Sequence, residues 1–340
     1  MSDNMIINVD LKHTDYNIYI ERGNLAKAGE LLDLNRRVLV VTDEGVPAEY
    51  AQCVSAQCKE GFIETIPQGE KSKSIEVYEK LLRKMLELNF TRKDAVVAVG
   101  GGVCGDLAGF VAASYMRGVD FYNIPTTVLS QVDSSIGGKV AVNLGSVKNI
   151  VGAFYQPKAV LIDPETLSTL PQRQISAGLA EAVKMAVNFD KDLFEKIEAR
   201  KDPMEMIDEI IVGSLLIKKK VVEEDEKESG LRKVLNFGHT IGHAVESAAE
   251  GELYHGECVA LGMLAVCSGE VKDRVRKVLE SFNLPTSFGA EKEKLLKAVS
   301  HDKKAGASTT TVIISDEIGT YRMKEESIEE LSKRMEQFYL

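Results

Sequence analysis

Three histidines close together in the sequence are the residues best placed to do chemistry. His239 and His243 lie four positions apart in NFGHTIGH, and His255 follows in YHGE. Because residues i and i+4 share one face of a helix, the first two imidazoles can reach a common site, and His255 can approach from the next helix. A single helical histidine is usually a core or surface residue, but three of five histidines within seventeen positions favour metal binding or proton transfer.

A catalytic zinc site needs a third protein ligand and an open coordination position. Glu181, in GLAEAVK, is a candidate because a carboxylate among small apolar residues on a helix is costly to bury without a partner. Cys258 is a competing candidate, although a free cysteine on an apolar helix is usually a packing residue. The residue pattern alone leaves this choice open.

A glycine-rich loop, GGGVCGD, follows the apolar run 95–99 and leads into a helical pattern. Small residues at such a point let backbone N–H groups approach a phosphate at a helix N-terminus. The loop differs from GxGxxG, so an ordinary tight turn is the alternative interpretation. Asp43 and Glu70 also lie near the ends of expected strands, where carboxylates can bind ribose hydroxyls or remain solvated loop acids.

Basic residues recur beside small or apolar neighbours along the chain. They are Arg117, Lys139, Lys148, Lys184, Lys218, Arg232 and the pair Lys303 and Lys304. Cations gathered in a cleft of a net acidic protein can hold a small polyanion. Solvated surface lysine is the alternative, and it explains most of the run 218–220.

Composition excludes several classes of partner. Acidic residues number 52 and basic residues 42, and the resulting formal charge of -10 disfavours nucleic acid. We find no basic, apolar leader at the N-terminus and no apolar run long enough for a membrane span. The five cysteines form no CxxC pair, which is typical of a reducing compartment. We therefore expect a cytoplasmic protein with no membrane partner.

The elements that must position these residues divide the chain in two. The first half alternates β-branched runs with helical patterns, which predicts a parallel sheet with crossover helices. The runs are 37–42, 61–66, 95–99, 121–124 and 159–162, and a helix is expected over 74–88 with Ser74 as its cap. We expect an α/β Rossmann-like nucleotide-binding domain over residues 1–163.

The second half reads as successive helices, so we expect a mainly α-helical metal- and substrate-binding domain over residues 164–340. The expected helices cover 174–187, 203–222, 238–249, 255–267 and 272–282. One exception is the threonine-rich run 309–315, which we expect to form a hairpin with 320–323.

Long motifs in this order resemble the 3-dehydroquinate synthase family, and the resemblance covers nearly the whole chain. The motifs are PQGEKSKS, AVGGGVCGDLAGFVAASYMRG, IPTTVLSQVDSSIGGKVAVN, KNIVGAFYQP, LSTLPQRQISAGLAEAVKMA, VVEEDEKESGLRKVLNFGHTIGHAVE and YHGECVALGM. The resemblance implies NAD and a divalent metal, zinc or cobalt, as cofactors.

The resemblance also implies a role for individual residues. It implies that Glu181, His239 and His255 bind zinc, and that His243 transfers protons and contacts substrate. The NAD contacts that it implies are Asp43, Glu70, Lys73, Gly101, Gly102, Gly105, Asp106, Thr126, Thr127 and Lys148, with Asp133 and Lys139 near the nicotinamide and substrate. The implied substrate ligands are Lys139, Asn149, Lys184, Lys218, Arg232, Asn236 and one of Lys303 and Lys304. Arg117 would reach the site of a partner subunit, which implies a homodimer.

The implied substrate is an anionic sugar-acid phosphate, 3-deoxy-D-arabino-heptulosonate 7-phosphate. The reaction implied by the resemblance is transient oxidation by NAD, elimination of phosphate, return of the hydride and aldol closure to 3-dehydroquinate, a step of the shikimate pathway to chorismate and aromatic amino acids. The substrate would undergo no net oxidation or reduction. Such a site needs a Lewis acid, a proton acceptor and fixed cations for a dianionic leaving group.

Three alternatives remain to be weighed against this interpretation. A sister sugar-phosphate cyclase would be expected to differ at the cations and imidazoles near the carboxylate end, but Lys218, Arg232, Asn236 and His243 keep the pattern of the family. A polyol dehydrogenase of similar architecture would have no use for so many anion-binding residues. A non-catalytic regulator that binds NAD or metal would not need candidate residues for every chemical step.

Overall fold

The computed structural model describes residues 5–12, 14–145, 147–301 and 309–339. The chain divides into two compact units, Met1–Leu170 and Pro171–Leu340. The domain boundary expected from the sequence lies slightly earlier, so the short 3-10 helix Pro164–Thr169 groups with the first unit and not the second. None of the helices within these ranges is both long and apolar enough to cross a membrane.

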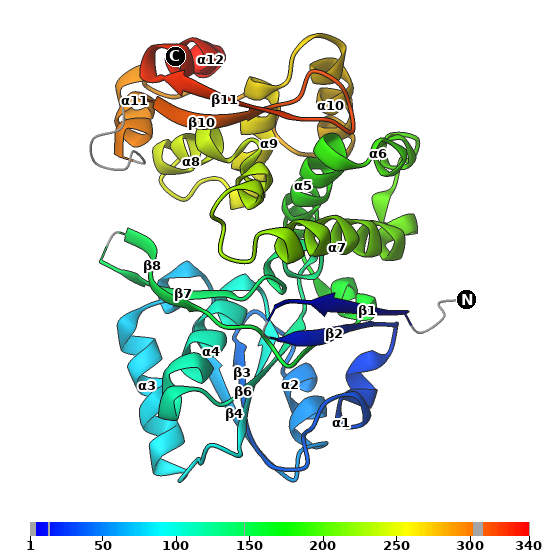
Figure 1. The fold of residues 1–340 in the computed structure, drawn as a ribbon, viewed down its shortest axis with the longest axis vertical. Helices are drawn as coiled ribbons and strands as arrows, with labels where there is room; N and C mark the ends of the chain where they lie inside the picture. The colour runs from blue at the N-terminus through cyan, green and yellow to red at the C-terminus, as the bar shows by residue number, and fades with distance from the viewer. Residues whose placement is uncertain (1–4, 13, 146, 302–308, 340) are drawn as a thin grey trace. The chain divides into compact units, whose positions relative to one another are not determined.

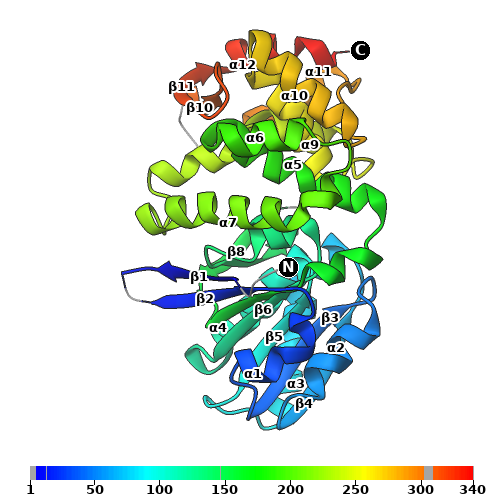
Figure 2. The same ribbon diagram turned by 90° about the vertical axis from the view of Figure 1, so that its right-hand side faces the viewer.

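The first unit contains the expected parallel sheet. Among the described residues it has seven strands in the order β1-β2-β9-β6-β5-β3-β4. They are β1 (Met5–Asp10), β2 (Asp15–Ile20), β3 (Arg37–Asp43), β4 (Glu60–Ile66), β5 (Ala95–Gly100), β6 (Asp120–Pro125) and β9 (Ala159–Ile162). Every neighbouring pair is parallel except β1 and β2, an antiparallel pair that projects from the rest of the sheet in Figure 2.

Both faces of this sheet are covered, which explains why its central strands are continuous apolar runs. Leu39 and Val41 of β3 face α3 (Ile75–Glu87) and α4 (Gly102–Ser114). Val38 and Val40 face α1 (Ala28–Leu31) and α2 (Ala48–Ser55) on the opposite side. Figure 1 shows the two helix pairs on either side of the sheet.

The expected cap of α3 is confirmed, since the Ser74 side chain accepts a hydrogen bond from the Val77 N–H at 3.3 Å. A hairpin of β7 (Lys139–Leu144) and β8 (Val147–Phe154) was not predicted from the sequence. It packs tightly on α4, because a Cβ added at Gly109 would lie 2.4 Å from Cγ1 of Val140.

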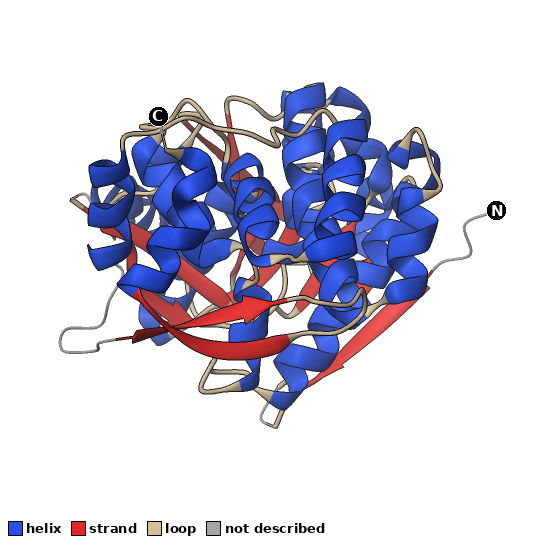
Figure 3. Cartoon of the chain, turned by 90° about the horizontal axis from the view of Figure 1, so that it is seen from above, coloured by secondary structure: helices blue, strands red, loops and turns tan. Residues whose placement is uncertain are grey.

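The second unit is mainly helical, as expected (Figure 1; Figure 3). Its described α-helices are α5 (Gln172–Phe189), α6 (Lys191–Glu198), α7 (Ile207–Glu224), α8 (His239–Ala248), α9 (His255–Val266), α10 (Gly269–Ser281), α11 (Lys292–His301) and α12 (Ile328–Met335). The expected hairpin is present as β10 (Thr309–Ile314) and β11 (Arg322–Ser327), but the bounds predicted for its second strand were wrong.

Candidate active site

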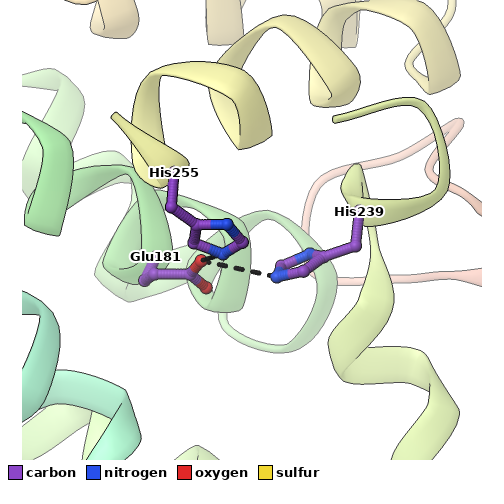
Figure 4. A group of neighbouring side chains, drawn as sticks. All are labelled: Glu181, His239 and His255. Carbon is purple, nitrogen blue, oxygen red and sulfur yellow. Dashed lines mark ion pairs between the residues drawn. The ribbon is translucent and has the colours of Figure 1, made fainter. Parts of the chain in front are cut away.

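Three helices of the second unit bring a carboxylate and two imidazoles together. Glu181 lies within α5, while His239 and His255 are the first residues of α8 and α9. Their ligand atoms all lie within 4.8 Å of one another. Figure 4 shows the two rings converging on the carboxylate, with the ion pairs drawn as dashed lines.

Glycines allow these helices to approach closely enough for the three side chains to meet. A Cβ added at Gly256, next to His255, would lie 1.8 Å from the carbonyl oxygen of Ala177 on α5. Gly238 has a φ of +76°, a conformation that glycine adopts at little cost, and from it α8 starts directly at His239. Gly238 therefore sets where α8 begins, and Gly256 allows α9 to approach α5 closely.

The distance from each imidazole to the Glu181 carboxylate matches the geometry of a coordinated ion. Nε2 of His239 and Nε2 of His255 each lie 3.5 Å from Oε1 of Glu181. Two ligands bound at about 2.1 Å in tetrahedral geometry are about 3.4 Å apart. Both carboxylate oxygens of Glu181 are buried, and Oε2 forms an ion pair with Lys184. Oε1 has no well-aligned hydrogen bond to any described residue, so a cation between the three groups would satisfy it.

The remaining ring nitrogens of the two histidines have acceptors of their own. Nδ1 of His239 lies 3.1 Å from the carbonyl oxygen of Phe237, and Nδ1 of His255 lies 3.1 Å from Oε2 of Glu246. A proton on Nδ1 leaves the Nε2 lone pair free for a metal. Sequence reasoning missed Glu246; its only signal was its position seven residues after His239, on the same helical face.

Burial and charge perturb these groups in different directions. Burial raises the pKa of Glu181, but Lys184, His239 and His255 together lower it well below its usual value. Burial lowers the pKa of His239 to about 3, with Lys184 adding to the effect. For His255 burial also lowers the pKa, but the carboxylates of Glu181 and Glu246 outweigh it and raise the value to about 9. Without a metal, the Glu181 carboxylate therefore faces cationic Lys184, cationic His255 and neutral His239, and a divalent ion bound here would take the place of the proton on Nε2 of His255.

Two further predicted residues lie beside this group. Nζ of Lys184 is 2.5 Å from Oε2 of Glu181, and both side chains are almost completely buried, at 2% and 1% exposure. His243 is exposed, and its ring centroid lies 5.5 Å from that of His239 and 5.8 Å from that of His255. Cys258, the competing ligand, is buried in α9 and belongs to neither of the two metal-capable groups found among the described residues.

The other predicted anion-binding residues of this unit lie on α7 and the loop after it. Lys218 and Arg232 are both buried, and Nη1 of Arg232 donates to the Glu226 carbonyl at 2.6 Å. Asn236 is exposed and donates to Oε1 of Glu228 at 3.3 Å. Lys303 and Lys304 lie outside the described residues.

The first unit gathers predicted cofactor residues at the carboxyl ends of its strands. The Thr126 N–H donates to the Gly100 carbonyl at 3.0 Å, which joins the ends of β5 and β6. Asp43, at the end of β3, lies close enough that a Cβ on Gly100 would be 3.5 Å from its Oδ2. A Cβ added at Gly101 would meet Thr127 at 3.2 Å. Gly101 and Gly102, at the start of α4, have no side chain that could cover the backbone N–H groups of its first turn, while Gly105 is buried and its N–H donates to the Gly101 carbonyl at 3.0 Å.

A second group of predicted residues meets beside α4. Lys73 is buried and its ammonium contacts both Asp106 and Asn149. Glu70 accepts a hydrogen bond from Asn143 at 2.8 Å, and the Asn143 side chain also accepts from the Asn149 N–H at 2.9 Å. Asn143 was not identified from the sequence because an amide on an unpredicted strand gives no signal of its own.

The remaining predicted residues of the first unit are more exposed. Asp133 lies in a π-helical turn, Ser130–Ser134, an irregularity that is frequent at functional sites. Lys139 and Lys148 are exposed on β7 and β8. Arg117 is exposed and has a φ of +70° between Met116 and Gly118, both of which also have positive φ.

Comparison with known protein families gives two adjacent matches. A model described as "3-dehydroquinate synthase N-terminal" matches residues 63–177, and one described as "3-dehydroquinate synthase C-terminal" matches residues 178–305. The chain is also 43% identical to the 3-dehydroquinate synthase of Lactococcus lactis subsp. cremoris (strain MG1363), over 97% of this chain and 99% of that protein.

Two solved structures are similar over almost the whole chain. A 2-deoxy-scyllo-inosose synthase complexed with carbaglucose-6-phosphate, NAD+ and Co2+ has a TM-score of 0.87 at 25% identity, covering 97% of this chain and 98% of that one. A 2-epi-5-epi-valiolone synthase from Streptomyces hygroscopicus subsp. jinggangensis 5008, with NAD+ and Zn2+ bound, has a TM-score of 0.87 at 26% identity, covering 96% and 97%.

Proposed function

The chain belongs to the 3-dehydroquinate synthase family, and from this premise we propose that it converts 3-deoxy-D-arabino-heptulosonate 7-phosphate to 3-dehydroquinate and inorganic phosphate. The observation that carries the proposal is the convergence of Glu181, His239 and His255 in a chain of this family. The reaction assigns the enzyme to the phosphate-eliminating carbon–oxygen lyases of the shikimate pathway.

The metal ligands in this proposal are Glu181, His239 and His255. Two imidazoles and one carboxylate form a donor set used by catalytic zinc, and they leave a coordination position for substrate. The spacing of 3.5 Å between each Nε2 and the shared oxygen supports the assignment, as does the buried carboxylate. Zinc and cobalt both suit such a site.

For NAD, the glycine loop and the strand ends of the first unit are the proposed binding residues. The N-terminus of α4 offers backbone N–H groups for the pyrophosphate, and Asp43 offers a carboxylate for ribose hydroxyls. Burial raises the pKa of Asp43, which is consistent with a carboxylate set into the fold rather than left in solvent. The resemblance adds Glu70, Lys73 and Lys148 to the set.

When bound, NAD supplies a transient hydride acceptor and the divalent ion supplies a Lewis acid. The residues of the chain bind the anionic substrate and move its protons. Lys184, Lys218 and Arg232 are buried cations suited to the carboxylate and phosphate, and fixed cations favour departure of a dianion. His243 is the proposed proton-transfer group, because it stands one turn from His239 yet is not needed for the metal.

Two further features of the protein are part of this proposal. We place it in the cytoplasm because all five cysteines are free thiols, as expected in a reducing compartment. We also propose a homodimer in which Arg117 of each subunit completes the site of the other. The exposed arginine and the exposed apolar Met116 beside it support a contact surface at this turn.

The decisive experiment is an assay of the purified protein supplied with zinc and NAD. We expect phosphate and 3-dehydroquinate to form in equal amounts from the heptulosonate phosphate, with no net NADH, and chelation to stop the reaction. Glu181→Gln is the inactive comparison. Glu224→Ala, which removes an exposed carboxylate at the end of α7, is the matched control and should behave as the wild type.

Other results would point to the alternatives. Faster turnover of a hexose phosphate or a non-acidic heptulose phosphate would indicate a sister cyclase, a possibility raised by the structural likeness to the inosose and valiolone synthases. Net NADH formation from a polyol would indicate a dehydrogenase. Binding of NAD and zinc without turnover of any of these compounds would indicate a regulator.

A further inference from the structure

Glu246 is the one carboxylate of α8, and it lies against a histidine of the proposed metal set. Its Oε2 is 3.1 Å from Nδ1 of His255, while Nε2 of the same ring is 3.5 Å from Oε1 of Glu181. The side chains of Glu246 and His255 are only 22% and 35% exposed. The imidazole is therefore held from both ends by carboxylates that come from different helices.

We propose that Glu246 is a positioning residue that fixes the tautomer and orientation of His255 and thereby strengthens metal binding. A hydrogen bond from Nδ1–H to the carboxylate leaves the Nε2 lone pair directed at the ion, and it makes the imidazole a better electron donor. This inference rests on the metal site of the proposed function. It adds a residue that does not itself touch the ion.

The two ligand histidines differ in this respect. Nδ1 of His239 faces the neutral carbonyl of Phe237, whose position is set by the backbone before α8. His255 depends instead on a side chain that mutation can remove. Loss of Glu246 therefore removes the hydrogen-bond acceptor of His255 and leaves the acceptor of His239 in place.

Glu246 also neighbours His243. One ligand atom from each of His243, Glu246 and His255 lies within 4.8 Å of the others. A second ion bound by these three residues is the competing explanation for the carboxylate. The separation of 3.1 Å between Nδ1 and Oε2 is a hydrogen-bond distance, and sharing His255 with the first site would force two cations close together.

The test is zinc affinity, measured by competition with a chromophoric chelator on metal-free protein. We expect Glu246→Ala to weaken zinc binding by about 10- to 100-fold, as is usual for loss of such a partner. Glu246→Gln retains an oxygen acceptor and should recover part of that loss. Glu224→Ala, also a carboxylate loss but on α7, should bind as the wild type.

Each result has a distinct meaning. Thermal unfolding of the metal-free variants separates a folding defect from a metal-binding defect, because Glu246→Ala should unfold near the wild-type temperature without zinc. Wild-type affinity in Glu246→Ala, alongside loss of binding in Glu181→Gln, would overturn this inference alone. Two zinc ions per chain in the wild type would replace it with the second-ion explanation. Absence of zinc binding by the wild type would overturn the proposed function as well.

Discussion

Arg173 on α5 forms a two-point ion pair with Glu257 on α9. Nε of the guanidinium lies 2.7 Å from Oε1, and Nη2 lies 2.8 Å from Oε2. Oε2 of Glu257 also accepts from the Tyr254 N–H at 2.7 Å, so the carboxylate caps the first turn of α9 as well. The pair therefore ties the helix that carries Glu181 to the turn that carries His255.

Loss of this pair should loosen the metal site without removing a ligand. We expect Arg173→Ala to weaken zinc binding by about 10-fold, within the range known for groups that orient ligands. Arg173→Lys keeps the charge but not the two-point geometry, so its affinity should be intermediate. Arg83→Ala, which breaks an exposed ion pair within α3, is the control. Equal zinc affinity in Arg173→Ala and the control would refute the role of the pair.

Gly256→Ala should disrupt the site by steric pressure. The added methyl group would lie 1.8 Å from the Ala177 carbonyl, so α9 must move away from α5 and carry His255 with it. We expect a loss of at least about 1–3 kcal/mol in unfolding free energy, as overpacking typically costs, together with weaker zinc binding. Denaturant unfolding measures the loss of stability, and chelator competition measures the loss of zinc affinity.

Gly29→Ala provides the comparison for this substitution. Its methyl group would lie no closer than 3.2 Å to its neighbours, so less strain is expected than at Gly256, and Gly29 is not part of the metal site. If Gly256→Ala unfolded and bound zinc like Gly29→Ala, the close approach of α5 and α9 would not matter to the site.

Asp225 should make the loop before Arg232 sensitive to acid. Its carboxylate accepts from the N–H groups of Ser229, Gly230 and Arg232 at 2.8, 2.7 and 3.0 Å, and these backbone hydrogen bonds lower its pKa. An aspartate whose pKa in the folded protein lies below its unfolded value of about 3.9 stabilises the fold when the pH is above about 3.9. That stabilisation is lost as the pH falls toward the folded pKa.

Urea unfolding of the wild type and Asp225→Asn from about pH 7 to about pH 3 tests this expectation. The wild type should be the more stable protein at neutral pH, and the difference should shrink below about pH 4. A difference that stayed constant across this range would contradict the assignment of the loop's stability to the ionised carboxylate of Asp225.

Arg117 gives the sharpest test of the proposed dimer. Arg117→Ala and Glu181→Gln should each be nearly inactive alone, for different reasons. In a heterodimer purified through two different tags, the Arg117→Ala subunit keeps its own Glu181 and receives Arg117 from its partner. One complete site then remains, so about half of the wild-type activity per dimer is expected from a symmetric pair. An inactive heterodimer, or a fully active Arg117→Ala protein, would show that Arg117 does not complete its partner's site.

The central sheet could be predicted from the sequence because its strands are buried on both faces and must therefore be apolar. Val38, Val40 and their neighbours on β3 are buried on both faces, so the strand is an unbroken β-branched run. By contrast, β8 is mostly exposed and β11 is largely charged, and neither has the apolar pattern of a buried strand. Polar side chains of β11 bond to the neighbouring strand β10, as Glu325 does with Thr311. These hydrogen bonds form only when the two strands pair, so the sequence of β11 alone does not predict them.

The metal group was partly visible in the sequence. Helical spacing identified His239 and His243 as neighbours, but it could not tell which of them shares Glu181 with His255, because that depends on how α8 and α9 pack. Glu246 was hidden for the same reason. An acid on an amphipathic helix is usually solvated, and the contact of Glu246 with His255 depends on where α9 places that ring.

X-ray absorption at the zinc edge of the zinc-loaded protein tests the central claim most directly. We expect a first shell of nitrogen and oxygen at about 2.0–2.2 Å with two imidazole ligands, and loss of ordered binding in Glu181→Gln. A sulfur shell at about 2.3 Å would assign the ion to a cysteine such as Cys258 and contradict the site formed by Glu181, His239 and His255.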